Sequence, residues 1–459
     1  MSAAPRTPGE ARFAGKFGWV MFDWANQPFF TIITTFIFAP YFTAQMIGDP
    51  VRGQAAFGYV QATAGFIIAV LSPFLGAMAD AGGARKGYIA FFQALTCVGC
   101  VMLWWALPGQ PGLIFPIAVA LIIATIGAEF SIVFNNALLP TLVPPAKVGR
   151  LSGAGWGMGY VGGLIALFAV LIVSRPELIG ITPPEGQALF GLDRASFAAE
   201  RMTGPASALW LIVFVLPLFL WTPDVVSTGL GRLEAARQGG RRLLDTLRRV
   251  REYRNPTTFL LAYMIYNDGL AAVIAFGGIY AAGTFGWGTT ELGIFGILLT
   301  VIGAISAFAG GALDDRLGSK RTISIAIYLV TIATFGIVSV TPTGALFLLD
   351  LPAKAAGSGL FSSVQEQIFF AFAVLLGMGM GPMQAASRTM MGRLAPKGME
   401  GEFYGLYALS GKATTFLAPL CIAIATQVFV SQRAAGVVVI VFLVVGYILL
   451  RRVREKPGS

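Results

Sequence analysis

The sequence predicts an all-α integral membrane protein with 12 transmembrane helices arranged as two similar six-helix halves. Three observations support this fold class: the composition, a series of long apolar segments, and a loop sequence that occurs twice. The chain has 459 residues, of which 56% are hydrophobic and 12% are charged, whereas about 25% charged residues is typical of soluble domains. A soluble protein needs a polar surface, and this composition cannot supply one.

The apolar segments are long enough to form helices that cross a bilayer, which takes about 20 residues each. The sixth segment is short, which leaves room for an earlier start. The predicted spans are 17–45, 55–79, 87–107, 112–139, 152–174, 207–222, 257–282, 290–313, 320–340, 365–392, 402–430 and 433–452.

The repeated loop occupies residues 76–86 and again residues 311–321, so the copies are 235 residues apart. Each copy joins two apolar segments. A repeat at about half the chain length indicates two similar halves, which is how many secondary transporters are built. Asp23 in the first span and Asp268 in the seventh are a further match between the halves.

The predicted division is an N-terminal half at 1–222, a cytoplasmic linker at 223–256 and a C-terminal half at 257–459. The linker is rich in arginine, and Leu243 and Leu247 fall on one face of a helix. We therefore expect a basic amphipathic helix that lies on the anionic inner leaflet. A soluble linker without membrane contact is the alternative.

The distribution of Lys and Arg predicts the orientation, because these residues concentrate in cytoplasmic loops. With the N-terminus in the cytoplasm, 25 of the 32 basic residues fall on the inner side, counting Arg388 at the inner end of the tenth span, and 6 fall on the outer side, while Lys412 lies deeper within a span. The expected location is the inner (plasma) membrane of a bacterium, with both termini in the cytoplasm.

The same composition argues against other classes of function. The net charge of +10 could suit nucleic-acid binding, but the basic residues lie between spans rather than on a polar domain. Cys97 and Cys100 have the spacing of a metal or redox pair, but they lie in an apolar span of a chain without histidine. We expect no enzymatic activity, cofactor, metal site or nucleic-acid partner. The expected partners are the lipid bilayer and a small-molecule solute, and the expected state is a monomer.

Ionisable residues inside predicted spans are the first candidates for function, since each costs about 2.5–3.5 kcal/mol on insertion scales. In one interpretation the carboxylates bind a proton or a substrate amine, and the basic groups bind a substrate carboxylate. Because the chain lacks histidine, proton coupling would have to use a carboxylate. The alternatives are static ion pairs and, for the arginine, a gate between the halves. These residues are Asp23, Glu129, Asp268, Arg388 and Lys412.

The repeated loop resembles the hallmark loop of the major facilitator superfamily, written G-x-L-a-D-R-x-G-r-k. The second copy is nearly complete, whereas the first has Ala81 in place of the first arginine. The resemblance implies a cytoplasmic clasp that favours one transport state, and we expect a firmer clasp in the C-terminal half. A tight turn without a gating role is the alternative. The expected gating residues are Gly76, Asp80, Arg85, Gly311, Asp315, Arg316 and Lys320.

Further stretches narrow the resemblance. Residues 22–26 (FDWAN), 136–140 (NALLP) and 401–412 (GEFYGLYALSGK) resemble signatures of the bacterial "unknown major facilitator" family. That family is similar to the yeast autophagy-related vacuolar amino-acid effluxer. The resemblance covers the whole chain and implies secondary transport, with amino-acid efflux as the expected activity. An exporter of drug-like or lipid-like amphiphiles, and a non-transporting receptor or scaffold, are the alternatives.

The resemblance also implies that spans 1, 4, 7 and 10 line a central cavity. Polar and aromatic residues near the intramembrane charges are therefore further candidates for solute contact. These are Asn26, Asn135, Asn136, Tyr266, Asn267, Gln384 and Tyr407.

Overall fold

The computed structural model describes residues 11–82, 84–181, 188–225, 252–355, 357–395 and 400–455. Within these ranges, 12 helices are long and apolar enough to cross a membrane. The predicted spans are therefore confirmed, and the sixth begins at Ala198 rather than at residue 207. Most of the predicted linker helix, residues 226–251, lies outside the described residues.

The N-terminal half contains the first six spans. The first is built from four consecutive helical segments, the third ends in a 3₁₀ turn, and two short 3₁₀ helices lie between the fifth and sixth. The elements are α1 (Phe13–Pro28), η1 (Phe29–Phe36), α2 (Phe38–Tyr41), η2 (Phe42–Met46), α3 (Pro50–Gly82), α4 (Lys86–Met102), η3 (Leu103–Trp105), α5 (Pro111–Leu142), α6 (Pro145–Ser174), η4 (Pro176–Ile179), η5 (Leu189–Gly191) and α7 (Ala198–Trp221).

The C-terminal half repeats this order and adds a small antiparallel hairpin between its third and fourth spans. Its eleventh span is made of two helices. The elements are α9 (Arg254–Phe285), α10 (Thr289–Leu317), α11 (Ser319–Ser339), β1 (Gly344–Ala345), β2 (Leu349–Asp350), α12 (Val364–Leu394), α13 (Glu400–Ala413), α14 (Leu417–Phe429) and α15 (Ala434–Arg451).

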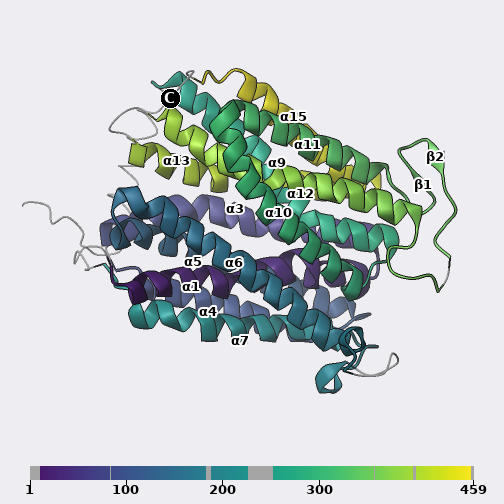
Figure 1. Cartoon of the computed structure of the whole chain (residues 1–459). Coiled ribbons are helices and arrows are strands. Elements are labelled where there is room, and N and C mark those ends of the chain that lie inside the picture. Colours follow the sequence, from purple (N-terminus) through teal and green to yellow (C-terminus); the bar gives the residue numbers. More distant parts are fainter. Residues whose placement is uncertain are drawn as a thin grey trace, which may run out of the picture.

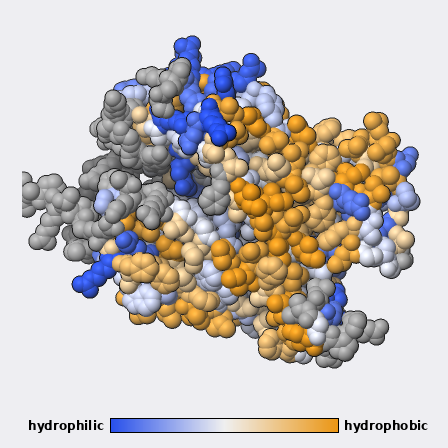
Figure 2. Space-filling view, viewed as in Figure 1, coloured by the Kyte–Doolittle hydropathy of each residue, from blue (hydrophilic) through white to orange (hydrophobic). Residues whose placement is uncertain are grey.

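The two halves lie side by side as two layers of long helices (Figure 1). One layer contains α1 and α4 to α7, the other contains α9 to α15, and α3 lies where they meet. We call the membrane side that carries Ala11 and Glu455 the terminus side, and the side that carries β1 and β2 the hairpin side. The surface is apolar across the middle and polar towards the two ends, as expected of a protein surrounded by lipid (Figure 2).

The halves approach each other closely on the hairpin side. A Cβ atom at Gly278 of α9 would lie 2.5 Å from the carbonyl oxygen of Thr35 in η1, so only glycine allows this crossing. A Cβ atom at Gly296 of α10 would lie 2.7 Å from the Phe36 ring. Small residues permit such close helix packing in membranes. The outer part of span one is therefore wedged between α9 and α10.

Hydrogen bonds between the halves reinforce this closure. The Gln54 side chain on α3 donates to Thr426 Oγ1 at 2.9 Å and to the Gln432 carbonyl at 3.1 Å. The Thr289 hydroxyl donates to the Glu200 carboxylate, which joins α10 to α7. Together these contacts hold the hairpin side shut.

The terminus side is more open. A Cβ atom at Gly311, near the terminus-side end of α10, would meet no other heavy atom within 4 Å. The side chains of Asn136 on α5 and Arg388 on α12 are exposed. The structure thus describes halves that are closed on the hairpin side and accessible from the terminus side.

Candidate functional site

The two halves are joined near mid-membrane by an ion pair between Glu129 on α5 and Lys412 on α13. The Lys412 ammonium donates to the Glu129 carboxylate, and their side chains are 31% exposed for Lys412 and 20% exposed for Glu129. Among the ion pairs of the described residues, this pair alone connects the halves. It brings together two of the charges predicted as functional, at a place where both side chains are partly exposed.

Lys412 lies at the end of a broken helix. The helix α13 ends at Ala413, and α14 begins at Leu417. At the break the N–H groups of Thr415 and Leu417 donate to carbonyls three residues back, those of Lys412 (3.4 Å) and Thr414 (2.8 Å). The predicted span at 402–430 is present at Gly405–Phe429, and the structure adds a break within it. Broken helices in transporters commonly mark binding sites.

Asp268 on α9 lies beside this break, next to the Thr414 side chain. It is 2% exposed. It therefore belongs to the interior of the C-terminal half rather than to the surface between the halves.

Asp23 occupies the equivalent place in the N-terminal half and faces α6, the fifth span, as Asp268 faces the eleventh. Its carboxylate lies against Gly155, and its backbone lies against Gly159, where a Cβ atom would be 3.5 Å from the Asp23 carbonyl. Glycine at these positions leaves room for the carboxyl group. The predicted match between Asp23 and Asp268 thus extends to the helices they face, although α6 is unbroken.

Two of the predicted solute-contacting asparagines are instead buried in the N-terminal half. Asn26 is 3% exposed and Asn135 is fully buried. The Gln93 side chain donates to Asn26 Oδ1 and to Ser131 Oγ, both at 3.0 Å, and so links α1, α4 and α5. The sequence analysis missed Gln93 and Ser131, although a glutamine inside an apolar span was a usable signal.

On the C-terminal side, aromatic residues form the surface that approaches the broken helix. The rings of Tyr263 and Tyr407 stack with their centroids 4.1 Å apart. Tyr266, a predicted site residue, is buried and shares a 2.6 Å hydrogen bond with Ser387. Tyr263 was missed by the sequence analysis, because tyrosines in apolar spans more often pack than bind.

Arg388 lies within electrostatic range of the stacked tyrosines Tyr263 and Tyr407. It is exposed and makes no ion pair with any residue that the structure describes. Gln384, one turn earlier on α12, is half-buried, as is Asn267 on α9. Arg388 thus lies near the two stacked tyrosines, one of which, Tyr407, is on the same helix as Lys412.

On the terminus side, each half closes its repeated loop with a carboxylate from the segment after its last span. In the N-terminal half, the Asp224 carboxylate accepts from the main-chain N–H of Arg85 (2.9 Å) and of Lys86 (3.2 Å). In the C-terminal half, Glu455 accepts from the N–H of Ser319 (2.9 Å) and of Lys320 (3.0 Å). Both carboxylates therefore stabilise a helix N-terminus, where negative charge is favourable.

The ion pairs of the second loop do not use the residues that the sequence predicted. Asp315 and Arg316 are exposed and make no ion pair with a described residue. Instead, Arg393 on α12 lies 3.6 Å from buried Asp314 and 3.1 Å from Glu455. This brace lies within the C-terminal half. The structure does not describe the surroundings of Gly76 or the side chain of Asp80.

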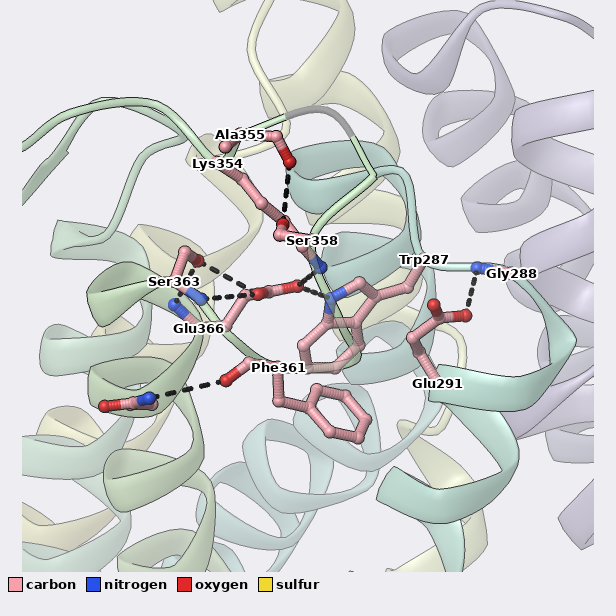
Figure 3. Close-up of polar contacts among 10 residues, drawn as sticks. Trp287, Gly288, Glu291, Lys354, Ala355, Ser358, Phe361, Ser363 and Glu366 are labelled. Carbon is pink, nitrogen blue, oxygen red and sulfur yellow. Dashed lines mark hydrogen bonds and ion pairs between the residues drawn. The ribbon is translucent and has the colours of Figure 1, made fainter. Parts of the chain in front are cut away.

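On the hairpin side, a buried carboxylate anchors the loop that follows β2 (Figure 3). Glu366 at the start of α12 is fully buried and lies 2.9 Å from Lys354. It also accepts a 2.8 Å hydrogen bond from Trp287 and a 3.0 Å bond from Ser363. Trp287 in turn lines a cavity of about 130 Å³ beside Glu200 and Thr289. These contacts of Glu366 hold the loop that follows β2 against α12 and against Trp287, on the closed hairpin side.

A family model described as "Vacuole effluxer Atg22 like" matches residues 43–149 and 145–459. The chain belongs to the Atg22-like vacuole effluxer family. This match confirms the family resemblance that was inferred from the sequence. The two halves and the ion pair between them are therefore those of an Atg22-like protein.

Relatives of this Atg22-like protein occur in bacteria and fungi. An uncharacterized MFS-type transporter, YxiO of Bacillus subtilis, is 26% identical over 458 residues, which is 96% of this chain and 95% of that protein. Autophagy-related protein 22-1 of Neosartorya fischeri is 25% identical over 317 residues, 66% of this chain. That match spans 48% of the fungal protein, so about half of its length has no counterpart in the alignment.

Solved transporter structures share the fold of this Atg22-like protein. A D-xylose–proton symporter superposes with a TM-score of 0.66 at 12% identity, over 97% of this chain and 98% of that one. The nucleoside transporter NupG superposes with a TM-score of 0.61 at 14% identity, over 95% of this chain and 97% of that one. The predicted fold, with 12 spans in two six-helix halves, is confirmed. At this identity the comparison concerns the fold alone.

Proposed function

We propose that this protein is a secondary active transporter that exports a small zwitterionic solute, an amino acid, by alternating access between its halves. The observation that carries the proposal is the Glu129–Lys412 pair, which joins the halves and is partly exposed. A zwitterion brings an ammonium and a carboxylate of its own. It can therefore replace each partner of the pair with a matched charge, which leaves neither group unpaired.

The surroundings of the pair support a zwitterion over a simple cation. Arg388 is exposed and has no ion-pair partner among the described residues, so the site holds a cation that a substrate carboxylate can neutralise. Asn136, Gln384 and Asn267 supply amide groups that can donate and accept hydrogen bonds. A drug-like cation would meet both Arg388 and Lys412, and like charges in a poorly solvated site repel strongly.

Alternating access follows from the contacts between the halves. The hairpin side is shut by the glycine crossings at Gly278 and Gly296 and by the Gln54 hydrogen bonds. In the proposed cycle, solute enters from the terminus side and separates Glu129 from Lys412. The halves then rock, so that the hairpin side opens. Protonation of Glu129 would also release Lys412, and this is how we propose that protons couple to transport.

We further propose that the terminus side is cytoplasmic and that the protein acts as a monomer in a bacterial inner membrane. The basic residues of the terminus-side loops support this orientation. The test is counterflow in proteoliposomes with a panel of labelled amino acids, nucleosides and lipophilic cations, with and without a pH gradient. Saturable counterflow of an amino acid, lost in Glu129→Gln, supports the proposal. Counterflow of lipophilic cations alone would replace it with amphiphile export.

A further inference from the structure

The break between α13 and α14 faces a buried carboxylate, that of Asp268, which lies beside the Thr414 side chain. Asp268 is 2% exposed, and neither of its carboxylate oxygens accepts a hydrogen bond from any residue that the structure describes. The Thr414 hydroxyl lies beside the carboxylate, close enough to interact with it, but makes no hydrogen bond of standard geometry with a described residue. Burying an ionised carboxylate without a partner is very costly. The carboxylate is therefore expected to be neutralised, either by a proton or by a bound cation.

The main chain at the break presents further oxygen atoms. In a continuous helix, the N–H groups of Thr415 and Leu417 would bond to the carbonyls of Gly411 and Ala413, four residues back. Here they bond to the carbonyls of Lys412 and Thr414 instead. The carbonyls of Gly411 and Ala413 are thereby released from their helical partners. They belong to the C-terminal end of α13, where the helix dipole favours a cation.

We infer that Asp268, Thr414 and the released carbonyls at the break of span eleven bind a sodium ion. A carboxylate, a hydroxyl and main-chain carbonyls are the oxygen donors that hard cations prefer. Unwound carbonyls at half-helix ends coordinate Na⁺ in other transporter folds. A proton would bind to one carboxylate oxygen only. It would not use the Thr414 hydroxyl or the released carbonyls.

Neither of the nearby basic groups satisfies Asp268. Lys412, two residues from Thr414, donates to Glu129 in the opposite half. Arg388 is exposed and makes no ion pair with a described residue. The sodium site is therefore separate from the ion pair assigned above to the solute.

Sodium at this site would also fix the segment that positions Lys412, and so link ion binding to the contact between the halves. This link rests on the proposed transport function, whereas sodium binding does not. The test is therefore a binding measurement that needs no transport. Purified full-length protein is unfolded thermally in sodium chloride, and in potassium or choline chloride at equal ionic strength. Binding of radiolabelled sodium is measured in parallel.

The expected result is a saturable rise in melting temperature that is specific to sodium, since a ligand of the native state stabilises it. Asp268→Asn should abolish both the rise and the sodium binding. Thr414→Val should weaken sodium binding by about tenfold, as loss of one donor costs on the order of a hydrogen bond to a charged group, and Thr414→Ser should restore it. Asp23→Asn is the matched control, because Asp23 is the equivalent carboxylate beside an unbroken helix, and it should keep the sodium response.

Two results would overturn the inference. One is wild-type protein that shows no difference between sodium and choline. The other is a sodium response that survives in Asp268→Asn or disappears equally in Asp23→Asn. If Asp268→Asn does not fold, the comparison of Thr414→Val with Thr414→Ser decides the question. A failed counterflow experiment would leave this test intact, so the two proposals fail separately.

Discussion

Glu129 and Lys412 pair across the two halves of the bundle, one from α5 and the other from the last turn of α13. The two residues lie on helices of opposite halves, so the pair forms and breaks as the halves move. Its partial exposure means that the contact is neither a fully buried salt bridge nor a surface one. This position makes it the point where solute binding and movement of the halves can be coupled.

Exchanging the two charges tests whether the pair acts as a unit. Glu129→Gln or Lys412→Met alone should abolish counterflow, because the remaining charge is left without its partner. The single reversals Glu129→Lys and Lys412→Glu should each lower the stability of the fold. The reversed pair, Glu129→Lys with Lys412→Glu, should recover part of that stability. We expect a coupling energy of about 1–2 kcal/mol in a double-mutant cycle, between the values for exposed and buried pairs. Additive effects of the two single changes would show that the residues do not interact.

A methyl group at Gly278 should oppose closure of the hairpin side. In Gly278→Ala the new Cβ would lie 2.5 Å from the Thr35 carbonyl oxygen, so the halves must separate there. Gly277→Ala is the matched control, because nothing lies within 4 Å of its Cβ position. The readout is thiol labelling of Gln45→Cys, a residue that lines the hairpin-side cavity. Labelling should be faster with Gly278→Ala and unchanged with Gly277→Ala. Equal rates in both would argue against this closure.

Removing Gln93 should destabilise the N-terminal half. Gln93→Leu leaves Asn26 Oδ1 and Ser131 Oγ without this donor, and each unsatisfied buried group costs about 1–3 kcal/mol. Thermal unfolding should show the loss. The double variant Gln93→Leu with Asn26→Leu should cost less than the two single changes together, because both partners of one hydrogen bond are then absent. A strictly additive double variant would contradict the network.

Replacing Arg393 should lower the stability of the fold more than replacing Asp315 or Arg316 in the neighbouring hallmark loop. Arg393→Met leaves Asp314 and Glu455 without their shared cation, so we expect a loss of about 1–3 kcal/mol. Asp315→Asn and Arg316→Met are controls that should change the melting temperature little, because exposed residues without partners contribute little. If Arg316→Met proved the more damaging change, the clasp predicted from the sequence would be restored.

The spans and their pairing into halves could be predicted because lipid restricts the chain so strongly. A segment that crosses the bilayer must be helical and apolar over about 20 residues. The match between Asp23 and Asp268 was likewise readable, since both stand out as charges in apolar surroundings. Glu129 and Lys412 were identified as charges, but their pairing was not, because it depends on how the halves meet.

The contacts of several predicted residues depend on details that the sequence carries weakly. Adjacent residues on a helix point about 100° apart, so Asn135 and Asn136 cannot both face the space between the halves. The structure exposes Asn136 and buries Asn135. The break after Ala413 does have a sequence signal that was not used: Pro419, in the first turn of α14, lacks the N–H that would bond to the carbonyl of residue 415 in a continuous helix. Asp314 and Asp315 are adjacent in the sequence. Only the packing of the helices shows that Arg393 pairs with Asp314.

Counterflow of labelled amino acids into proteoliposomes that contain the wild-type protein tests the central claim most directly. We expect saturable accumulation of at least one amino acid when the vesicles are preloaded with the unlabelled compound, and no accumulation in vesicles with Glu129→Gln. An absence of counterflow across the whole amino-acid panel, from protein that remains folded in the vesicles, would contradict the account.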